Sequence, residues 1–308
     1  MHSPTASAEV ESQRQAPARR ALRGAIRSLS AAGSASDPEL ARRQLHAYRR
    51  YLQALERDWR EVQRPPPGVD IVEPEQPAEG LYRLPVLERR RVDADLFVLT
   101  LPRPRAFRFQ PGQHVKLGLN GRRHSYSIAS AADADTLEFF IERRPGGGLS
   151  ERLSRVRVGE AVIMAARASG RLRLDPGYRQ HLMLATVTGV SPFLSMLRSR
   201  PQGAQSRLWL LHGASYRDQF GFDAELAQRA ASDPAFDYLP AVSRPEEVRN
   251  AGWAGLRGRL DALLPRLLRE RGLSPADTAI YACGHPDMVD TVSRQLADSG
   301  FSLQTERY

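Results

Sequence analysis

The sequence predicts two folded units in series: an antiparallel β-barrel over residues 81–178 and a doubly wound α/β unit with a parallel sheet over residues 179–308. Two observations predict them. Short alternating apolar runs begin at Leu81 and are separated by turn residues, as in small barrels. From His181 onward, short apolar strands alternate with helix-like segments, which favours a parallel sheet covered by helices. A third observation is that residues 1–80 show neither pattern and therefore form an extension.

The extension is predicted to have three parts. Residues 1–36 are rich in Ala, Ser and Arg and poor in apolar residues, which predicts disorder. An amphipathic helix is predicted over residues 37–64, because its apolar residues step by three and four positions. A Pro-rich acidic linker follows over residues 65–80. The helix either lies on the body of the chain or docks a partner, and self-association through residues 38–64 is one form of the second option.

In the barrel, strands are predicted from the runs "LYRLPVLERRRV", "LFVLTLP", "HVKLGL", "SYSIAS", "LEFFIERR" and "AVIMAAR". In the α/β unit, strands are predicted at 181–187, 207–213, 237–243 and 279–284, and helices at 193–200, 222–231, 256–271 and 287–299. Parallel sheets bind ligands at the carboxyl ends of their strands. The segments "TVTG", "LHGAS", "AVSR" and "YACGHP" lie at those ends and are the candidate binding loops.

Composition narrows the function classes. The net charge is +10 and only one of the 45 basic residues is Lys, so a basic surface could meet an acidic protein, an anionic membrane or nucleic acid. No aromatic-basic nucleic-acid module is visible, so no nucleic-acid partner is expected. The single cysteine, Cys283, excludes an intrachain disulfide and a cysteine-ligated iron–sulfur cluster in this chain, and no metal site is predicted. No membrane span or secretory signal is visible, so a cytoplasmic location is expected.

Two motifs in the barrel point to a flat cofactor with a phosphate tail. The stretch "RRHSYSIAS" places an aromatic ring and hydroxyls beside cations. A tyrosine ring can shield a flat ring system, and a serine hydroxyl can bond a ring nitrogen that gains a proton. The stretch "PGGGLSERL" joins a Gly-rich turn to a helix start, where backbone can approach a phosphate closely.

These motifs, in this order, resemble the ferredoxin–NADP reductase family over residues 81–308. The resemblance implies that the barrel binds FAD and that the α/β unit binds NADPH, with NADH as a second option. The FAD-binding residues that it implies are His124, Ser125, Tyr126, Ser127, Gly147, Gly148, Leu149 and Ser150. His124 stands where the family has an arginine that clamps the FAD pyrophosphate. Arg122 shares a strand face with His124 and is expected to substitute, whereas Arg123 points to the other face unless the strand bulges.

The α/β unit carries the coenzyme motifs of the family. The residues implied to bind the pyridine nucleotide are Thr188, Gly189, Ser243, Arg244, Arg259, Cys283, Gly284, Pro286, Met288 and Tyr308. Within this set, Ser243 and Arg244 are expected to hold the 2′-phosphate, with Arg259 as a second cation. Two positions depart from the family: Val187 stands where a glycine is common, and Ser215 where bacterial members often carry an arginine.

The resemblance also implies a catalytic set. The chain ends in "TERY", similar to the Glu-x-Tyr end of plant-type members, in which the terminal ring covers the flavin and moves aside for nicotinamide. The catalytic residues implied are Ser127, Cys283, Glu306 and Tyr308. Ser127 and Glu306 are expected to manage protons, and Cys283 and Tyr308 to shape the nicotinamide slot.

The function implied is electron transfer between NADPH and a one-electron protein carrier, an acidic ferredoxin or flavodoxin, through FAD. One alternative is the NADH-dependent reductase component of an oxygenase system whose iron–sulfur centre is on another subunit. An alternative of another class is a non-catalytic interaction protein on a flavin-binding fold, which the departures at His124, Val187 and Ser215 would favour.

Overall fold

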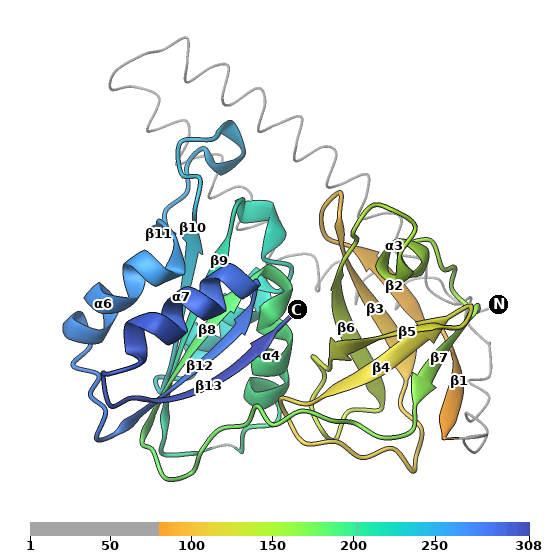
Figure 1. The fold of residues 1–308 in the computed structure, drawn as a ribbon, viewed down its shortest axis with the longest axis horizontal. Helices are drawn as coiled ribbons and strands as arrows, with labels where there is room; N and C mark the ends of the chain where they lie inside the picture. The colour runs from red at the N-terminus through yellow and green to blue at the C-terminus, as the bar shows by residue number, and fades with distance from the viewer. Residues whose placement is uncertain (1–79, 202) are drawn as a thin grey trace, which may run out of the picture.

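The computed structural model describes residues 80–201 and 203–308, which form two units side by side (Figure 1). The predicted tail (1–36), helix (37–64) and nearly all of the linker (65–80) lie outside the described residues. Within the described part of the chain, no helix is long and apolar enough to cross a membrane.

The first unit is built from two antiparallel sheets. One has the strand order β1-β7-β4-β5 and the other β2-β3-β6. The strands are β1 (Leu81–Pro85), β2 (Glu88–Arg91), β3 (Leu96–Pro102), β4 (His114–Leu119), β5 (Arg122–Ser127), β6 (Thr136–Glu142) and β7 (Ala161–Ala165). Residues at alternate positions, such as Val115 and Leu117, point into one apolar core. The short helix α3 (Leu149–Leu153) packs on that core through its first and last residues. This architecture confirms the predicted antiparallel barrel.

The second unit is a six-stranded sheet of order β11-β10-β9-β8-β12-β13, in which every pair is parallel. Its strands are β8 (Gln180–Thr186), β9 (Arg207–Ala214), β10 (Phe236–Val242), β11 (Leu256–Arg257), β12 (Thr278–Gly284) and β13 (Ser302–Arg307). Its helices are α4 (Ser191–Arg198), α5 (Asp223–Ser232), α6 (Leu260–Glu270) and α7 (Pro286–Leu296), with the 3-10 turns η1 (Val187–Val190), η2 (Arg217–Gln219) and η3 (Val248–Asn250). The sheet confirms the predicted α/β architecture.

Helices cover both faces of this sheet, and this explains why its strands read as continuous apolar runs. Along β8, Met183 and Ala185 belong to the core shared with α4 and α5, whereas Leu182 and Leu184 belong to the core shared with α6 and α7. The chain leaves β8 toward β9 and β10 on one side and later returns to β12 and β13 on the other. The carboxyl ends of β8 and β12 therefore flank the point where the strand order reverses, which is the ligand-binding position of such sheets.

The two units share an interface that is apolar at its centre and ion-paired at its rim. Phe140 of the barrel packs edge-to-face on Phe222, with 5.5 Å between ring centroids. Arg198 of α4 pairs with Glu138 of β6 at 2.6 Å, and Arg249 pairs with Asp93 of the barrel at 3.1 Å. These contacts fix how the two walls of the site face each other.

Two elements differ from the sequence predictions. The helix predicted over 256–271 begins at Leu260, because Leu256 and Arg257 form β11 and Gly258 follows with φ +126°. Residues 302–307 form β13, a strand that the sequence analysis did not predict.

Candidate functional site

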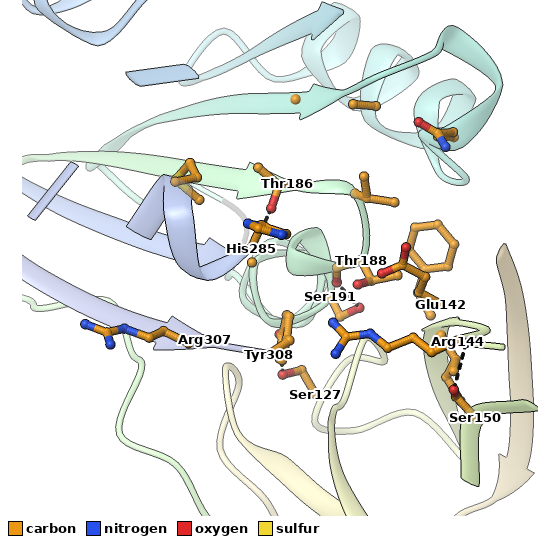
Figure 2. Close-up of a pocket in the computed structure, with 18 of the residues that line it drawn as sticks. Ser127, Glu142, Arg144, Ser150, Thr186, Thr188, Ser191, His285, Arg307 and Tyr308 are labelled. Atoms are coloured by element: carbon orange, nitrogen blue, oxygen red, sulfur yellow. Dashed lines mark hydrogen bonds between the residues drawn. The ribbon is translucent and has the colours of Figure 1, made fainter. Parts of the chain in front are cut away.

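A cavity of about 1110 Å³ lies where the two units meet. The barrel contributes β5 and the segment 140–150. The second unit contributes the carboxyl ends of β8, β9, β10 and β12, together with the end of the chain (Figure 2). The cavity is large enough for a dinucleotide, since sites for drug-sized ligands are commonly about 300–1,000 Å³.

Most residues predicted from the sequence line this cavity. Those in the lining are His124, Ser125, Tyr126, Ser127, Gly148, Leu149, Ser150, Thr188, Ser243, Arg259, Gly284, Met288, Glu306 and Tyr308. Those outside it are Gly147, Gly189, Arg244, Cys283 and Pro286. The lining therefore draws on segments as far apart in the chain as Ser127 and Tyr308, which are separated by 181 positions.

On the barrel wall, the cation beside β5 is Arg144 and not Arg122. Arg144 lines the cavity and extends into it (Figure 2), and its backbone N–H donates to Ser150 Oγ at 3.0 Å. Arg122 is exposed and does not line the cavity, because it lies two residues, roughly 6.6 Å, back along the strand from His124. Burial raises the pKa of Tyr126 to about 12, and Arg144 opposes that shift. The sequence signal for Arg144 was its place directly before the Gly-rich turn.

The Gly-rich turn places only part of its backbone at the cavity. Gly146 and Gly147 both have positive φ, at 115° and 75°. The N–H of Gly147 donates to Glu151 Oε2 at 2.5 Å, which explains why Gly147 is outside the lining. Gly148 and Ser150 face the cavity.

The end of the chain reaches the barrel through β13. Its parallel register pairs Cys283 with Glu306, so Tyr308 lies just past the end of β12. The Tyr308 hydroxyl is 2.6 Å from Ser127 Oγ (Figure 2). The same hydroxyl accepts from Cys283 Sγ at 3.1 Å. Burial raises the pKa of both Tyr308 and Cys283, so both are protonated at neutral pH. Three of the four predicted catalytic residues are therefore in direct contact.

Glu306, the fourth, is held by a histidine that the sequence analysis did not single out. Glu306 Oε1 is 2.6 Å from His114 Nδ1, and His114 Nε2 is 3.0 Å from Ser169 Oγ. Glu306 Oε2 is buried and has no hydrogen-bond partner among the described residues. His114 and Glu306 also border a second cavity of about 450 Å³, whose lining includes Arg171 and Arg173. The pair therefore separates the main cavity from a smaller one.

At the β10 end, Ser243 and Arg259 face the cavity, whereas Arg244 lies outside its lining. The Arg244 guanidinium donates to the Tyr216 hydroxyl at 2.9 Å. The guanidinium of Arg249 lies over the same tyrosine, 4.0 Å from the ring centroid. Two cations and an aromatic ring are thus gathered beside the site.

The strand ends at the reversal point approach each other too closely for side chains. A Cβ on Gly189 would lie 2.2 Å from the Cys283 carbonyl oxygen, and one on Gly284 would lie 2.0 Å from Thr186 Oγ1. Gly284 also has φ +137°. Glycine is required at both positions by this close approach. Among residues 80–201 and 203–308, no cluster of three or more His, Cys, Asp or Glu could hold a metal ion.

Known proteins match both units. An oxidoreductase FAD-binding domain model matches residues 83–171, and an oxidoreductase NAD-binding domain model matches residues 183–294. The chain is 37% identical over 202 residues to ferredoxin–NADP reductase B of Sorangium cellulosum, an alignment that covers 63% of this chain and 80% of that protein. The chain belongs to the ferredoxin–NADP reductase family. This confirms the family that the sequence motifs predicted.

A solved structure and a second relative complete the comparison. A ferredoxin NADP⁺ reductase of Neisseria gonorrhoeae with bound FAD and NADP superimposes with a TM-score of 0.67 and 27% identity, covering 74% of this chain and 98% of that one. The toluate 1,2-dioxygenase electron transfer component of Pseudomonas putida is 30% identical over 196 residues, covering 62% of this chain and 55% of that protein.

The family membership settles the class of reaction. The chain is an FAD-dependent oxidoreductase that exchanges electrons with a pyridine nucleotide, and the predicted cofactors, FAD and NADPH, agree with both domain models and with the ligands of the Neisseria structure. The homologues favour this enzyme over the non-catalytic interaction protein that the sequence analysis kept open.

Proposed function

We propose that this reductase passes electrons from NADPH, through FAD, to a one-electron carrier protein, a ferredoxin or a flavodoxin. The observation that carries the proposal is the contact of Tyr308 with Ser127 and Cys283 at the junction of the two units. One residue of the barrel, one of the parallel sheet and the end of the chain meet there. A hydride donor held by the sheet and an acceptor held by the barrel would meet at the same point.

The residues present fit FAD. The cavity of about 1110 Å³ offers the ring of Tyr126, and beside it Arg144, His124 and Ser125 supply donors for a pyrophosphate. Arg144 is the permanent cation in this set, and it is proposed to take the place of the clamping arginine at which this chain has His124. When bound, FAD accepts a hydride and releases electrons one at a time.

The remaining roles belong to side chains of this chain. Ser127 offers a hydroxyl to a ring nitrogen. Glu306 Oε2 is buried and has no hydrogen-bond partner in the described chain, so this oxygen is the proposed site of proton uptake and release. The Tyr308 ring covers the site and excludes water until nicotinamide displaces it. Cys283 stays protonated and neutral, so it shapes the slot without acting as a nucleophile.

NADPH is proposed over NADH because of the cations at the β10 end. Arg259 and Ser243 face the cavity and Arg244 is held beside it by Tyr216. A 2′-phosphate would draw Arg244 from the Tyr216 hydroxyl, since a charge-assisted bond to phosphate is stronger than one to a neutral phenol.

The carrier is proposed to be acidic and to dock beside Arg171 and Arg173. Residues 1–79 contain 12 arginines and 11 acidic residues, so nearly all of the net charge of +10 belongs to residues 80–308. Arg171 and Arg173 are exposed at the rim of the second cavity, which shares His114 and Glu306 with the main one. Electrons leaving there would cross the shared wall, and opposite charge would steer the carrier to it.

The docking surface is tested by charge reversal. Arg171→Glu with Arg173→Glu should slow reduction of an acidic ferredoxin and weaken its dependence on salt, whereas Arg269→Glu, on the exposed side of α6, should change neither. Equal effects of the two changes would place the carrier elsewhere.

A second candidate function is the reductase component of an oxygenase system. It is favoured by the likeness to the toluate dioxygenase electron transfer component, and the single cysteine places the iron–sulfur centre outside residues 1–308. Stopped-flow reduction of the bound flavin decides between the candidates. Faster reduction by NADPH, followed by one-electron transfer to ferredoxin or flavodoxin, supports the first; a preference for NADH contradicts it.

A further inference from the structure

The turn that follows β8 holds a valine in a backbone conformation that disfavours valine. Val187 has φ +44°, in the left-handed region. In the described part of the chain, Asn120 is the other non-glycine residue with positive φ, and asparagine tolerates that region. Valine is branched at Cβ and tolerates it poorly, so other contacts must hold Val187 in place.

Those contacts come from a buried histidine in the next strand. His212 of β9 is fully buried, and its Nε2 is 3.0 Å from the Val187 carbonyl oxygen. A carbonyl only accepts, so Nε2 carries the proton and donates. The His212 ring is fixed edge-to-face on Phe220, with 4.9 Å between centroids.

A tyrosine lies against the other ring nitrogen of that histidine. Burial lowers the pKa of His212 to about 4, so the ring is neutral and carries one proton, on Nε2. The other nitrogen, Nδ1, is then an acceptor and lies 3.3 Å from the Tyr238 hydroxyl of β10. The Tyr238 hydroxyl has one proton, and Asp223 of α5 competes with Nδ1 for it. We call His212 and Tyr238 the histidine–tyrosine pair.

The Val187 side chain, held in this way, faces the main cavity. Val187 lines the main cavity between Thr186 and Thr188, at the reversal point of the sheet. It also packs against the same buried apolar cluster as Tyr308. A glycine at this position would keep the turn without strain and leave the cavity wider.

We propose that Val187 is a residue that narrows the coenzyme cavity at its nicotinamide end, and that the histidine–tyrosine pair is the positioning device that keeps it there. The inference rests on the proposed placement of NADP(H) in this cavity. It predicts that the pair affects coenzyme binding only while residue 187 carries a side chain, because glycine keeps the left-handed turn by itself.

The experiment measures binding of NADP⁺ and of 2′,5′-ADP to the full-length FAD-loaded protein by calorimetry. Val187→Gly should tighten NADP⁺ at least about threefold, since removing a few carbon atoms from a pocket wall has effects of that order or larger. It should leave 2′,5′-ADP unchanged, because that ligand lacks the nicotinamide half.

The pair is tested in the native background and in the Val187→Gly background. His212→Leu and Tyr238→Phe should each change the NADP⁺ dissociation constant at least about threefold in the native background, and by less than about twofold when combined with Val187→Gly. Two variants are used because Tyr238 has a second partner and because Tyr238→Phe keeps the ring should His212→Leu fold poorly.

A matched control exists in the same sheet. His181 of β8 is buried, and its Nδ1 is 3.0 Å from the Tyr281 hydroxyl, away from the Val187 carbonyl that His212 bonds. Tyr281→Phe should therefore have the same effect on NADP⁺ binding, large or small, in both backgrounds. Equal effects of Tyr238→Phe in the two backgrounds, or an equal change of both ligands in Val187→Gly, would overturn the inference. Failure of the native protein to bind 2′,5′-ADP would instead overturn the proposed coenzyme site.

Discussion

The two buried histidines predict a loss of stability in mild acid. Burial lowers the pKa of His181 and of His212 to about 4, from an ordinary value of 6.5. In the unfolded chain both rings take up protons near pH 6.5, whereas in the folded chain they do so only near pH 4. Because the folded pKa is the lower one, the stabilisation is complete above about pH 6.5 and is lost as the pH falls toward about 4.

The size of the effect follows from the two shifts. Each histidine contributes at most about 1.4 kcal/mol per pH unit inside that window. Between about pH 6 and about pH 5 the two together should lower the free energy of unfolding by about 2 kcal/mol. For a folded body of this size, that corresponds to a fall in Tm of roughly 4–8 °C.

The assay is thermal unfolding at about pH 6 and about pH 5. Circular dichroism monitors unfolding and flavin fluorescence monitors cofactor release, so the two events are distinguished. His181→Gln and His212→Gln should each remove about half of the pH-dependent fall in Tm. His285→Gln, which replaces an exposed histidine, is the matched control and should keep the whole fall. If both buried-site variants keep the native pH dependence, the burial argument is wrong.

Four further outcomes are expected. Tyr308→Ser should raise flavin fluorescence, tighten nicotinamide binding and weaken discrimination against NADH, whereas Tyr308→Phe should keep the native fluorescence; titrations unchanged by the serine would show that the chain end does not cover the flavin. Glu306→Gln should slow flavin reduction in stopped flow by about a hundredfold, and His114→Gln should slow it by less, with full FAD content in both variants. Native rates in both variants would show that these residues do not transfer protons in the reaction. Arg244→Ala should weaken NADPH binding about ten- to a hundredfold, because a lost hydrogen bond to a charged group costs about 1.5–3 kcal/mol. It should leave NADH binding unchanged, and Arg269→Ala, the control, should leave the binding of both coenzymes unchanged. Gly284→Ala should lower Tm more than Gly272→Ala, because both have positive φ but only the first would place its Cβ against Thr186; equal losses would mean that the strand ends can separate.

Sequence periodicity predicted the elements whose burial is decided locally. The strands β8 and β12 are apolar on both faces because helices cover both, and this alone makes them recognisable as central parallel strands. The strand β13, by contrast, has the polar sequence "SLQTER" and is half-buried or exposed throughout. Its existence depends on pairing with β12, a contact that no local pattern encodes.

The site residues divide in the same way. Motifs placed Tyr126, Ser127 and Gly284 at the cavity, because short-range turn and strand geometry fixes them. His114 was missed because its partner Glu306 is 192 positions away in the chain. Strand alternation favoured Arg122 as the cation beside His124. The cavity, however, reaches only the later part of β5, and the arginine that lines it there is Arg144, from the segment that follows β6.

The proposed catalytic arrangement depends on the register of one edge strand. At the end of β13, Glu306 contacts His114, and Tyr308 just after the strand contacts Ser127; both partners belong to the barrel. Arg307 between them extends away from Ser127 (Figure 2) and pairs with Asp290 of α7 at 2.7 Å. A slip of one residue would turn Arg307 toward Ser127 and remove both functional side chains from the site. The Arg307–Asp290 pair does not supply much of the energy that prevents this, because both side chains are about half exposed and such pairs contribute at most about 1 kcal/mol. The six-residue ladder with β12, from Ala279 opposite Ser302 to Gly284 opposite Arg307, is therefore what sets the register, and the backbone of an edge strand positions the chemistry of the site.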